Sequence, residues 1–441
     1  MAQDIIELRE VGKSFRSADG HARPVLDGVD FTLREGEIVA LLGQSGSGKS
    51  TLLRIMAGLI GVDRGRVAYR GQPLHAPARS ISMVFQSFAL FPWLTVQQNV
   101  EIGLEARGMA PAERAERAEA AIALIGLTGF EGALPRELSG GMRQRVGIAR
   151  ALVTEPDVLL MDEAFSALDV LTGERLRDDI LELWTSGKMP TKAMLVVSHN
   201  IEEAVLMADR ILIFASDPGH IRFQLAVQLP RPREPESQDV RALIDEVYAL
   251  MTAGSGRSAR AAGAAAPLGR RLPAADVARM DGLLELLVEE PFSGRADLPV
   301  LAEASELTDS ELLTAAQALA LLGLAQLESG DLQITPLGRR YVEGAHTLRQ
   351  EIFGQQVLAH VPLAAHIRHS LEQEPSGQLA EGPFLRLLSE HLSESEAERV
   401  LQTVVAWGRH GEVFEYDYNA GTIHLPTGDE EQGPAPGARD G

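Results

Sequence analysis

The densest group of residues able to do chemistry is a glycine-rich loop near the N-terminus. Its glycines let backbone N–H groups surround an anion without side-chain clashes, and Lys49 adds a compact positive charge. The apolar run Ile38–Leu42 precedes the loop as an expected strand, and a helix should follow with its positive end facing the anion. This spacing is typical of a loop that binds nucleotide phosphates. Nine residues are expected to contact them: Gly43, Gln44, Ser45, Gly46, Ser47, Gly48, Lys49, Ser50 and Thr51.

Two adjacent carboxylates form the second candidate group. Asp162 and Glu163 follow the apolar run Val158–Met161, which places them at the exposed end of an expected buried strand. With the Ser50 hydroxyl, Asp162 is expected to hold Mg²⁺, and Glu163 is suited to orient and polarise an attacking water molecule. A strand that ends in Asp-Glu is often purely structural, so this prediction depends on the phosphate-binding loop that precedes it.

A third segment, Leu138–Arg145, joins a serine and two glycines to a basic helix. Ser139, Gly140 and Gly141 would leave free N–H groups at the helix start, where an anion binds favourably. With this segment placed between the loop and the two carboxylates, residues 1–230 resemble the ATP-binding subunits of ABC transporters. The signature of that family is Leu-Ser-Gly-Gly followed by a basic helix.

The resemblance implies roles for four further residues. Phe15 would stack on adenine, although a core position is the alternative, and Gln86 would sense Mg²⁺ and water. Asp169 would lie in a loop that contacts a second subunit, and His199 would contact the γ-phosphate from the end of an expected strand. The implied catalytic residues are Lys49, Gln86, Glu163 and His199, with ATP and Mg²⁺ as cofactors and with Ser50, Gln86 and Asp162 around the metal.

The resemblance also implies that neither subunit alone has a complete site. Two chains would form a head-to-tail homodimer around two ATP molecules, with Gly43–Thr51 of one chain facing Ser139–Gly141 of the other. ATP would join the protomers and hydrolysis would separate them. The cycle would then drive an integral membrane permease.

The elements around these residues alternate as an α/β domain requires. Apolar runs form the expected strands of a sheet covered on both faces, and residues 87–150 form an expected helical subdomain. We therefore predict a P-loop ABC ATPase domain over residues 1–230. Its expected strands are Ile38–Leu42, Ile81–Phe85, Val158–Met161 and Met194–Val197, and its expected helices are Leu52–Leu59, Gly140–Leu152, Leu168–Trp184 and Ile201–Met207.

Charge separates the rest of the chain from this domain. From residue 272 onward, 28 acidic residues against 10 arginines and no lysine give −18 of the total net charge of −21. We expect a helix and flexible linker over 231–271, an acidic, mainly α accessory domain over 272–427, and a disordered tail over 428–441. The accessory domain has two copies of a helix-turn-helix followed by a hairpin, which resembles tandem winged helices. Its charge argues against nucleic acid, and a protein-contact or regulatory role is favoured.

Several classes of protein and site are disfavoured by composition. The chain has no cysteine, which excludes disulfides and thiolate zinc sites. The longest uncharged apolar stretch, between Glu311 and Glu328, has 16 residues and is too short to span a membrane. His360, His366 and His369 could suggest a metal site, but a solvated helix face is the favoured interpretation. We expect a peripheral protein on the cytoplasmic face of the inner membrane.

The aromatic segment Met83–Val96 either docks onto a partner helix or packs within the helical subdomain. The sequence of this segment and the acidic C-terminal region resemble those of the importer ATPases for nitrate, sulfonate, taurine and bicarbonate. This implies import of a small anion with a permease and, indirectly, a periplasmic or extracellular solute-binding protein. The alternative is an ABC-type ATPase switch or regulator whose C-terminal domain binds protein or nucleic acid.

Overall fold

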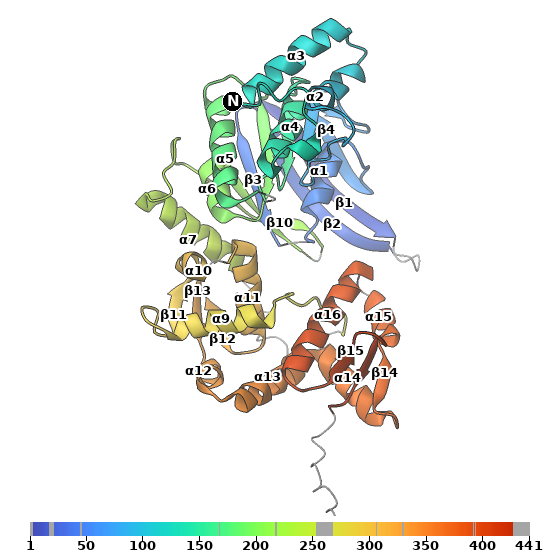
Figure 1. The fold of residues 1–441 in the computed structure, drawn as a ribbon, viewed down its shortest axis with the longest axis vertical. Helices are drawn as coiled ribbons and strands as arrows, with labels where there is room; N and C mark the ends of the chain where they lie inside the picture. The colour runs from blue at the N-terminus through green and yellow to red at the C-terminus, as the bar shows by residue number, and fades with distance from the viewer. Residues whose placement is uncertain are drawn as a thin grey trace, which may run out of the picture. The chain divides into compact units, whose positions relative to one another are not determined.

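The chain folds as two compact units, Met1–Met251 and Thr252–Gly441, seen in Figure 1. The computed structural model describes residues 3–16, 22–44, 46–166, 168–216, 218–252, 268–305, 307–328, 330–390, 392 and 394–426. The first unit extends past residue 230 because it includes nearly all of α7 (Gln238–Thr252). Ser45, residues 253–267 of the expected helix and linker, and the expected disordered tail lie outside the described residues.

A six-stranded sheet forms the centre of the first unit, in the order β10-β9-β3-β8-β7-β6. Neighbouring strands are parallel except for the antiparallel pair of β10 and β9. The central strands are fully buried, as expected of a sheet covered on both faces. The six strands are β3 (Ile38–Gly43), β6 (Ile81–Val84), β7 (Val158–Asp162), β8 (Ala193–Ser198), β9 (Arg210–Ala215) and β10 (His220–Ala226).

Parallel pairing brings three strand ends to one edge of this sheet. Leu42 pairs with Ser198 between β3 and β8, and Asp162 pairs with Val197 between β7 and β8. The residues that follow these strands therefore lie close together, although they are more than 150 positions apart in the chain at the extremes. The α/β prediction for this unit is confirmed.

A second, antiparallel sheet has the order β2-β1-β4-β5 and was not anticipated from the four apolar runs. Its strands bury side chains only intermittently, as in β1, so they lack continuous apolar runs. One buried core contains residues of both sheets and of α1 (Lys49–Met56), which ties the helix that bears the lysine to both layers. The strands are β1 (Asp4–Arg16), β2 (Ala22–Arg34), β4 (Arg64–Tyr69) and β5 (Gln72–Pro73).

A second core covers the other side of the sheet and contains the helices of the expected subdomain. α4 and α6 have the predicted bounds, whereas α1 begins three residues earlier than predicted, directly after Gly48. The elements are α2 (Val96–Glu105), α3 (Pro111–Leu124), the 3-10 turn η1 (Pro135–Glu137), α4 (Gly140–Leu152), α5 (Val170–Thr185) and α6 (Ile201–Met207).

The second unit repeats one order of elements, helix-strand-helix-helix-strand-strand. Its two sheets, β11-β13-β12 and β14-β16-β15, also share one strand order. The first copy has α9 (Val277–Val288), β11 (Arg295–Asp297), α10 (Leu298–Ser305), α11 (Asp309–Leu321), β12 (Ala325–Glu328) and β13 (Asp331–Ile334). The second has α14 (Pro362–Gln373), β14 (Gln378–Ala380), α15 (Gly382–Ser389), α16 (Glu394–His410), β15 (Glu415–Asp417) and β16 (Thr422–His424). The mainly helical prediction is confirmed.

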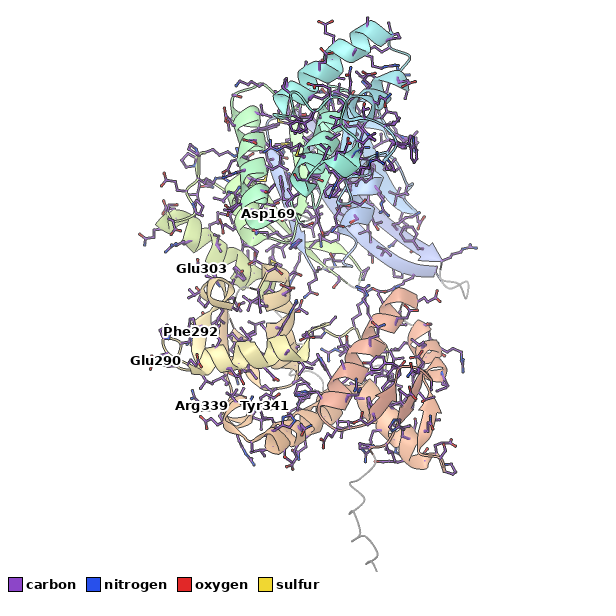
Figure 2. The ribbon with its side chains drawn as sticks, in the orientation of Figure 1. Asp169, Glu290, Phe292, Glu303, Arg339 and Tyr341 are labelled. Atoms are coloured by element: carbon purple, nitrogen blue, oxygen red, sulfur yellow. The ribbon has the colours of Figure 1, made fainter. Side chains whose placement is uncertain are left out.

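Two helices that were not predicted, α12 (Pro336–Glu343) and α13 (His346–His360), connect the copies. Tyr341 of α12, labelled in Figure 2, donates a hydrogen bond to Asp281 Oδ1 at 2.6 Å and lies 3.2 Å from His410 Nε2. Asp281 belongs to the first copy and His410 to the second, so this partly buried network joins them. No helix in the described part of the chain is long and apolar enough to cross a membrane.

Candidate active site

The glycine-rich loop runs from the end of β3 into α1, and its shape requires glycine at specific positions. Gly46 and Gly48 have φ of 77° and 99°, a region that side-chain-bearing residues rarely adopt. Gly43 faces the neighbouring strand, where an added Cβ would lie 2.6 Å from the backbone oxygen of Phe214. Ser47 donates its N–H to Gln44 O at 3.3 Å, which closes the loop on itself. The loop thus presents backbone at the start of a helix, as a phosphate site requires.

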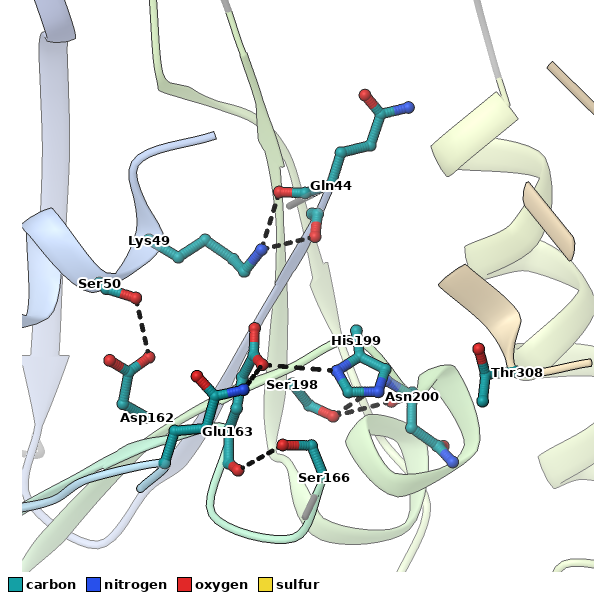
Figure 3. Close-up of polar contacts among 12 residues, drawn as sticks. Gln44, Lys49, Ser50, Asp162, Glu163, Ser166, Ser198, His199, Asn200 and Thr308 are labelled. Atoms are coloured by element: carbon teal, nitrogen blue, oxygen red, sulfur yellow. Dashed lines mark hydrogen bonds and ion pairs between the residues drawn. The ribbon is translucent and has the colours of Figure 1, made fainter. Parts of the chain in front are cut away.

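Lys49 lies along the inside of this loop. Its Nζ donates hydrogen bonds to Gly43 O at 2.7 Å and Gln44 O at 2.9 Å, shown in Figure 3. Burial lowers the pKa of Lys49, while the nearby carboxylates of Glu163 and Asp162 act in the opposite direction. A buried cation whose hydrogen bonds go to two carbonyl oxygens is well placed to exchange one of them for a phosphate oxygen.

Ser50 and Asp162 meet at the same edge of the sheet. Ser50 Oγ donates to Asp162 Oδ1 at 3.1 Å, although the two residues are 112 positions apart. Burial raises the pKa of Asp162, and the hydrogen bond from Ser50 opposes that rise. A hydroxyl and a carboxylate are hard oxygen ligands that suit Mg²⁺, which usually completes its shell with phosphate and water. No cluster of three or more His, Asp or Glu in the described ranges could hold a metal unaided.

Glu163 is the centre of a second group of polar side chains. Gln86 Nε2 donates to Glu163 Oε2 at 2.8 Å, and His199 Nδ1 lies 3.8 Å from the same oxygen. Glu163 also has a φ of 48°, a costly conformation for a side-chain-bearing residue that often marks a functional site. The three residues come from the ends of different strands, and Figure 3 shows Glu163 and His199 facing each other.

Three residues beside His199 were missed by the sequence analysis. Ser198 ends β8, and Asn200 caps α6 by accepting a hydrogen bond from Glu203 N–H at 2.7 Å. Burial raises the pKa of Glu203 to about 7, with a Ser198 hydrogen bond acting against that rise. Asn followed three residues later by Glu is a helix-start signal in the sequence. The burial of Glu203 depends on packing against other elements and has no such signal.

The remaining predicted residues form their printed hydrogen bonds at the starts of α4 and α5. Ser139 caps α4 by accepting a hydrogen bond from Met142 N–H at 3.3 Å, and Asp169 caps α5 by accepting one from Thr172 N–H at 3.1 Å. Gly141 packs so tightly against α5 that an added Cβ would lie 2.4 Å from Thr172 Cγ2. Their polar side chains bond within their own helix starts, and no hydrogen bond of the described residues links them directly to Lys49 or Glu163.

Phe15 also stands apart from the polar cluster. It lies in β1 with 44% of its surface exposed, and Lys13 Nζ sits 5.6 Å from the centre of its ring. This exposure excludes the alternative of a core phenylalanine. An open aromatic face remains available for stacking.

Comparison with known proteins agrees with this arrangement. Residues 26–166 match the ABC transporter family, and residues 299–417 match a C-terminal AAA-associated domain. The nitrate import ATP-binding protein NrtD of Synechocystis sp. is 42% identical over 52% of this chain and 85% of its own length. The taurine import ATP-binding protein TauB of Mesorhizobium japonicum is 45% identical over 46% and 78%, respectively. The aliphatic sulfonates import ATP-binding protein SsuB of Bacillus cereus is 37% identical over 55% and 94%. The chain belongs to the ABC transporter family of ATP-binding proteins.

Proposed function

We propose that this chain is the ATP-hydrolysing, energy-coupling subunit of an importer for a small anion such as nitrate, taurine or an aliphatic sulfonate. The names of the three relatives support the import of such an anion. The observation that carries the hydrolytic role is the cluster of Gln86, Glu163 and His199 at the edge where the loop lysine also lies. A phosphate site beside a poised carboxylate is the arrangement that hydrolysis of a nucleotide requires.

In the proposed mechanism, Lys49 and the loop N–H groups bind the phosphates and stabilise the charge that develops on them. Ser50 and Asp162 would hold Mg²⁺ with Gln86 nearby, and the ion would neutralise phosphate oxygens. Glu163 orients the attacking water and accepts its proton, because its carboxylate is held by Gln86 and faces His199. His199 contacts the γ-phosphate and keeps it aligned with that water.

The site is completed by a second copy of the chain. Ser139, Gly140, Gly141 and Asp169 would reach the nucleotide bound by the other protomer, while Phe15 stacks on the adenine. The caps that Ser139 and Asp169 form at their own helix starts, with Ser139 opening α4, support this head-to-tail homodimer. A helix start with small residues attracts an anion from outside its own chain.

The permease would dock on the aromatic segment after Gln86. Trp93 is 72% exposed and Phe91 is 37% exposed, and the two rings contact each other at 5.7 Å between centroids. Leu90 packs against the core and anchors the segment from beneath. We infer peripheral attachment at the cytoplasmic face of the inner membrane, with a solute-binding protein supplying the anion to the permease.

The second unit would act as an accessory domain of two winged-helix-like copies over residues 272–427. The repeated element order and the shared strand order support this assignment. Its acidic charge favours a protein partner or a regulatory role over nucleic acid. We place the ATPase domain at 1–230, its helical subdomain at about 87–150, and a connecting segment at 231–271.

Glu163→Gln tests the hydrolytic role. The variant should bind ATP normally, lose steady-state turnover and accumulate as an ATP-bound dimer in size-exclusion chromatography with light scattering. Glu182→Gln, on an exposed position of α5, serves as the matched control and should behave as wild type. Turnover at the wild-type rate in Glu163→Gln at saturating MgATP would refute the role of Glu163.

A further inference from the structure

We propose that Arg150 is a positioning residue that fixes residues 88–95, the docking segment, to α4. The segment carries the exposed pair Phe91 and Trp93, and α4 begins at Gly140, beside the serine proposed to reach a partner's nucleotide. The inference therefore rests on the docking and dimer roles proposed above, and it supplies the physical link between them. Arg150 contacts neither nucleotide nor permease in this role. It holds the backbone on which the two rings are mounted.

The guanidinium of Arg150 binds two consecutive carbonyl groups of the docking segment. Nη1 donates a hydrogen bond to Ala89 O, and Nη2 donates one to Phe88 O at 2.9 Å. Both residues have positive φ, 60° at Phe88 and 48° at Ala89, a costly backbone conformation that persists only where surrounding contacts enforce it. The planar fork of an arginine suits such a pair of acceptors better than the point charge of a lysine. The bend at these two positions therefore depends on Arg150.

Two further residues of α4 lie against the same part of the segment. The guanidinium carbon of Arg143 is 5.5 Å from the centre of the Phe88 ring. A Cβ added at Gly147 would lie 3.5 Å from Phe88 O, an ordinary contact distance, so the helix backbone itself approaches the segment closely. Arg143, Gly147 and Arg150 follow one another at helical spacing and share one face of α4. The docking segment thus lies along that face.

The other end of the segment is fixed by α2. Asn99, which is fully buried, accepts a hydrogen bond from Phe91 N–H at 2.8 Å and donates one to Phe91 O at 3.1 Å. It also donates to Leu94 O at 2.9 Å and to Thr95 O at 3.0 Å. Asn99 therefore sets the internal shape of the turn that carries the aromatic pair, whereas Arg150 sets how this turn is joined to α4. Loss of Arg150 should move the turn without unfolding it.

The helix between the two proposed surfaces is continuous. α4 runs from Gly140 to Leu152 without a break, so its start and its last turn, which contains Arg150, move together. A displacement of the helix start by the partner's nucleotide would then reach the docking segment through the two hydrogen bonds of Arg150.

Fluorine NMR of the full chain labelled with fluorotryptophan tests the positioning role. Tryptophans lie at positions 93, 184 and 407, so the Trp93 signal, assigned with Trp93→Phe, reports the docking segment and the other two serve as internal controls. Arg150→Met removes both donors and should shift and narrow the Trp93 signal, because a released surface loop moves on the nanosecond-to-microsecond timescale. The signals of Trp184 and Trp407 should stay in place.

Arg145→Met is the matched control, because Arg145 also belongs to α4 but contacts Ile125 O at 3.1 Å and Asp179 at 2.7 Å. It should leave the Trp93 signal in place. Arg150→Lys keeps the charge without the fork, so its Trp93 signal should lie between those of wild type and Arg150→Met. The wild-type Trp93 signal in folded Arg150→Met, or in Arg150→Lys where only that variant folds, would overturn the proposal. An Arg145→Met signal displaced as far as that of Arg150→Met would do the same.

A measurement with nucleotide separates this proposal from the proposed function. In Glu163→Gln, MgATP should form the dimer and shift the Trp93 signal, because the partner's nucleotide contacts the start of α4. Adding Arg150→Met should abolish this shift while light scattering still detects a dimer. A shift that persists in the double variant would overturn the link through Arg150, as would a Glu163→Gln dimer without any Trp93 shift. Failure of Glu163→Gln to dimerise would count against the proposed function instead, and the comparison without nucleotide would still decide the positioning role.

Discussion

Replacing Glu203 by glutamine should change how stability depends on pH. Burial raises the pKa of Glu203 from 4.5 to about 7 in the folded chain, whereas the unfolded chain keeps the ordinary value. Between these two values the folded state holds a proton that the unfolded state releases. Stability therefore falls as pH rises through this window, and the whole loss is present above the folded pKa. A glutamine has no proton to lose, so the variant escapes this penalty.

The size of the effect follows from the shift itself. A shift of this size at about 1.4 kcal/mol per pKa unit gives an upper limit of about 3.5 kcal/mol. Compared with wild type, Glu203→Gln should gain stability progressively from pH 4.5 to pH 8. The gain should level off above pH 8, because Glu203 is then ionised in both states of the wild-type chain.

Urea unfolding of the full chain at several pH values measures this difference. Tryptophans lie at positions 93, 184 and 407, so a shared Trp407→Phe background restricts the fluorescence signal to the first unit. Glu182→Gln, at an exposed position of the first unit, serves as the matched control. A Glu203→Gln difference that stays constant from pH 5 to pH 8, or that falls as pH rises, would refute the reasoning.

Two further substitutions test other parts of the structure. Lys49→Ala should weaken binding of a fluorescent ATP analogue by at least about tenfold, since the phosphates lose the buried cation of the loop; an unchanged titration would contradict that role. Tyr341→Phe should destabilise the second unit by about 1 kcal/mol, because the half-buried Asp281 carboxyl loses its donor. Unfolding followed through Trp407 measures this, and an unchanged midpoint would contradict it.

The parts of the site that could be predicted from sequence are those whose geometry is set locally. A glycine-rich loop between a strand and a helix specifies its own shape, so the positions around Lys49 follow from the chain itself. Asp162 could be placed at a sheet edge because its strand is a short, continuous apolar run. Parallel pairing places the end of β7 beside the end of β8, and the end of β8 beside the end of β3, as the α/β pattern implied.

Other features depend on contacts that no local pattern encodes. Glu203 looks like an ordinary first-turn acid of a short helix, and the burial that raises its pKa comes from the folded chain around it. β11 and β14 have three residues each, too few for an alternating pattern to be visible. The hairpins that pair with them were predicted because their turns carry Gly330 and Gly421, both at positive φ.

The division of the predicted residues into two groups has a physical basis in the charge of ATP. The triphosphate carries several negative charges, and the cations and N–H groups around Lys49 can face only one side of it. α4 is capped by a serine and begins with two glycines. Its positive end could therefore bind an anion on a different part of the same chain. Two copies placed head to tail would let each triphosphate satisfy both sites. Loss of nucleotide would then leave the two positive surfaces to repel each other, which is how hydrolysis could be converted into movement.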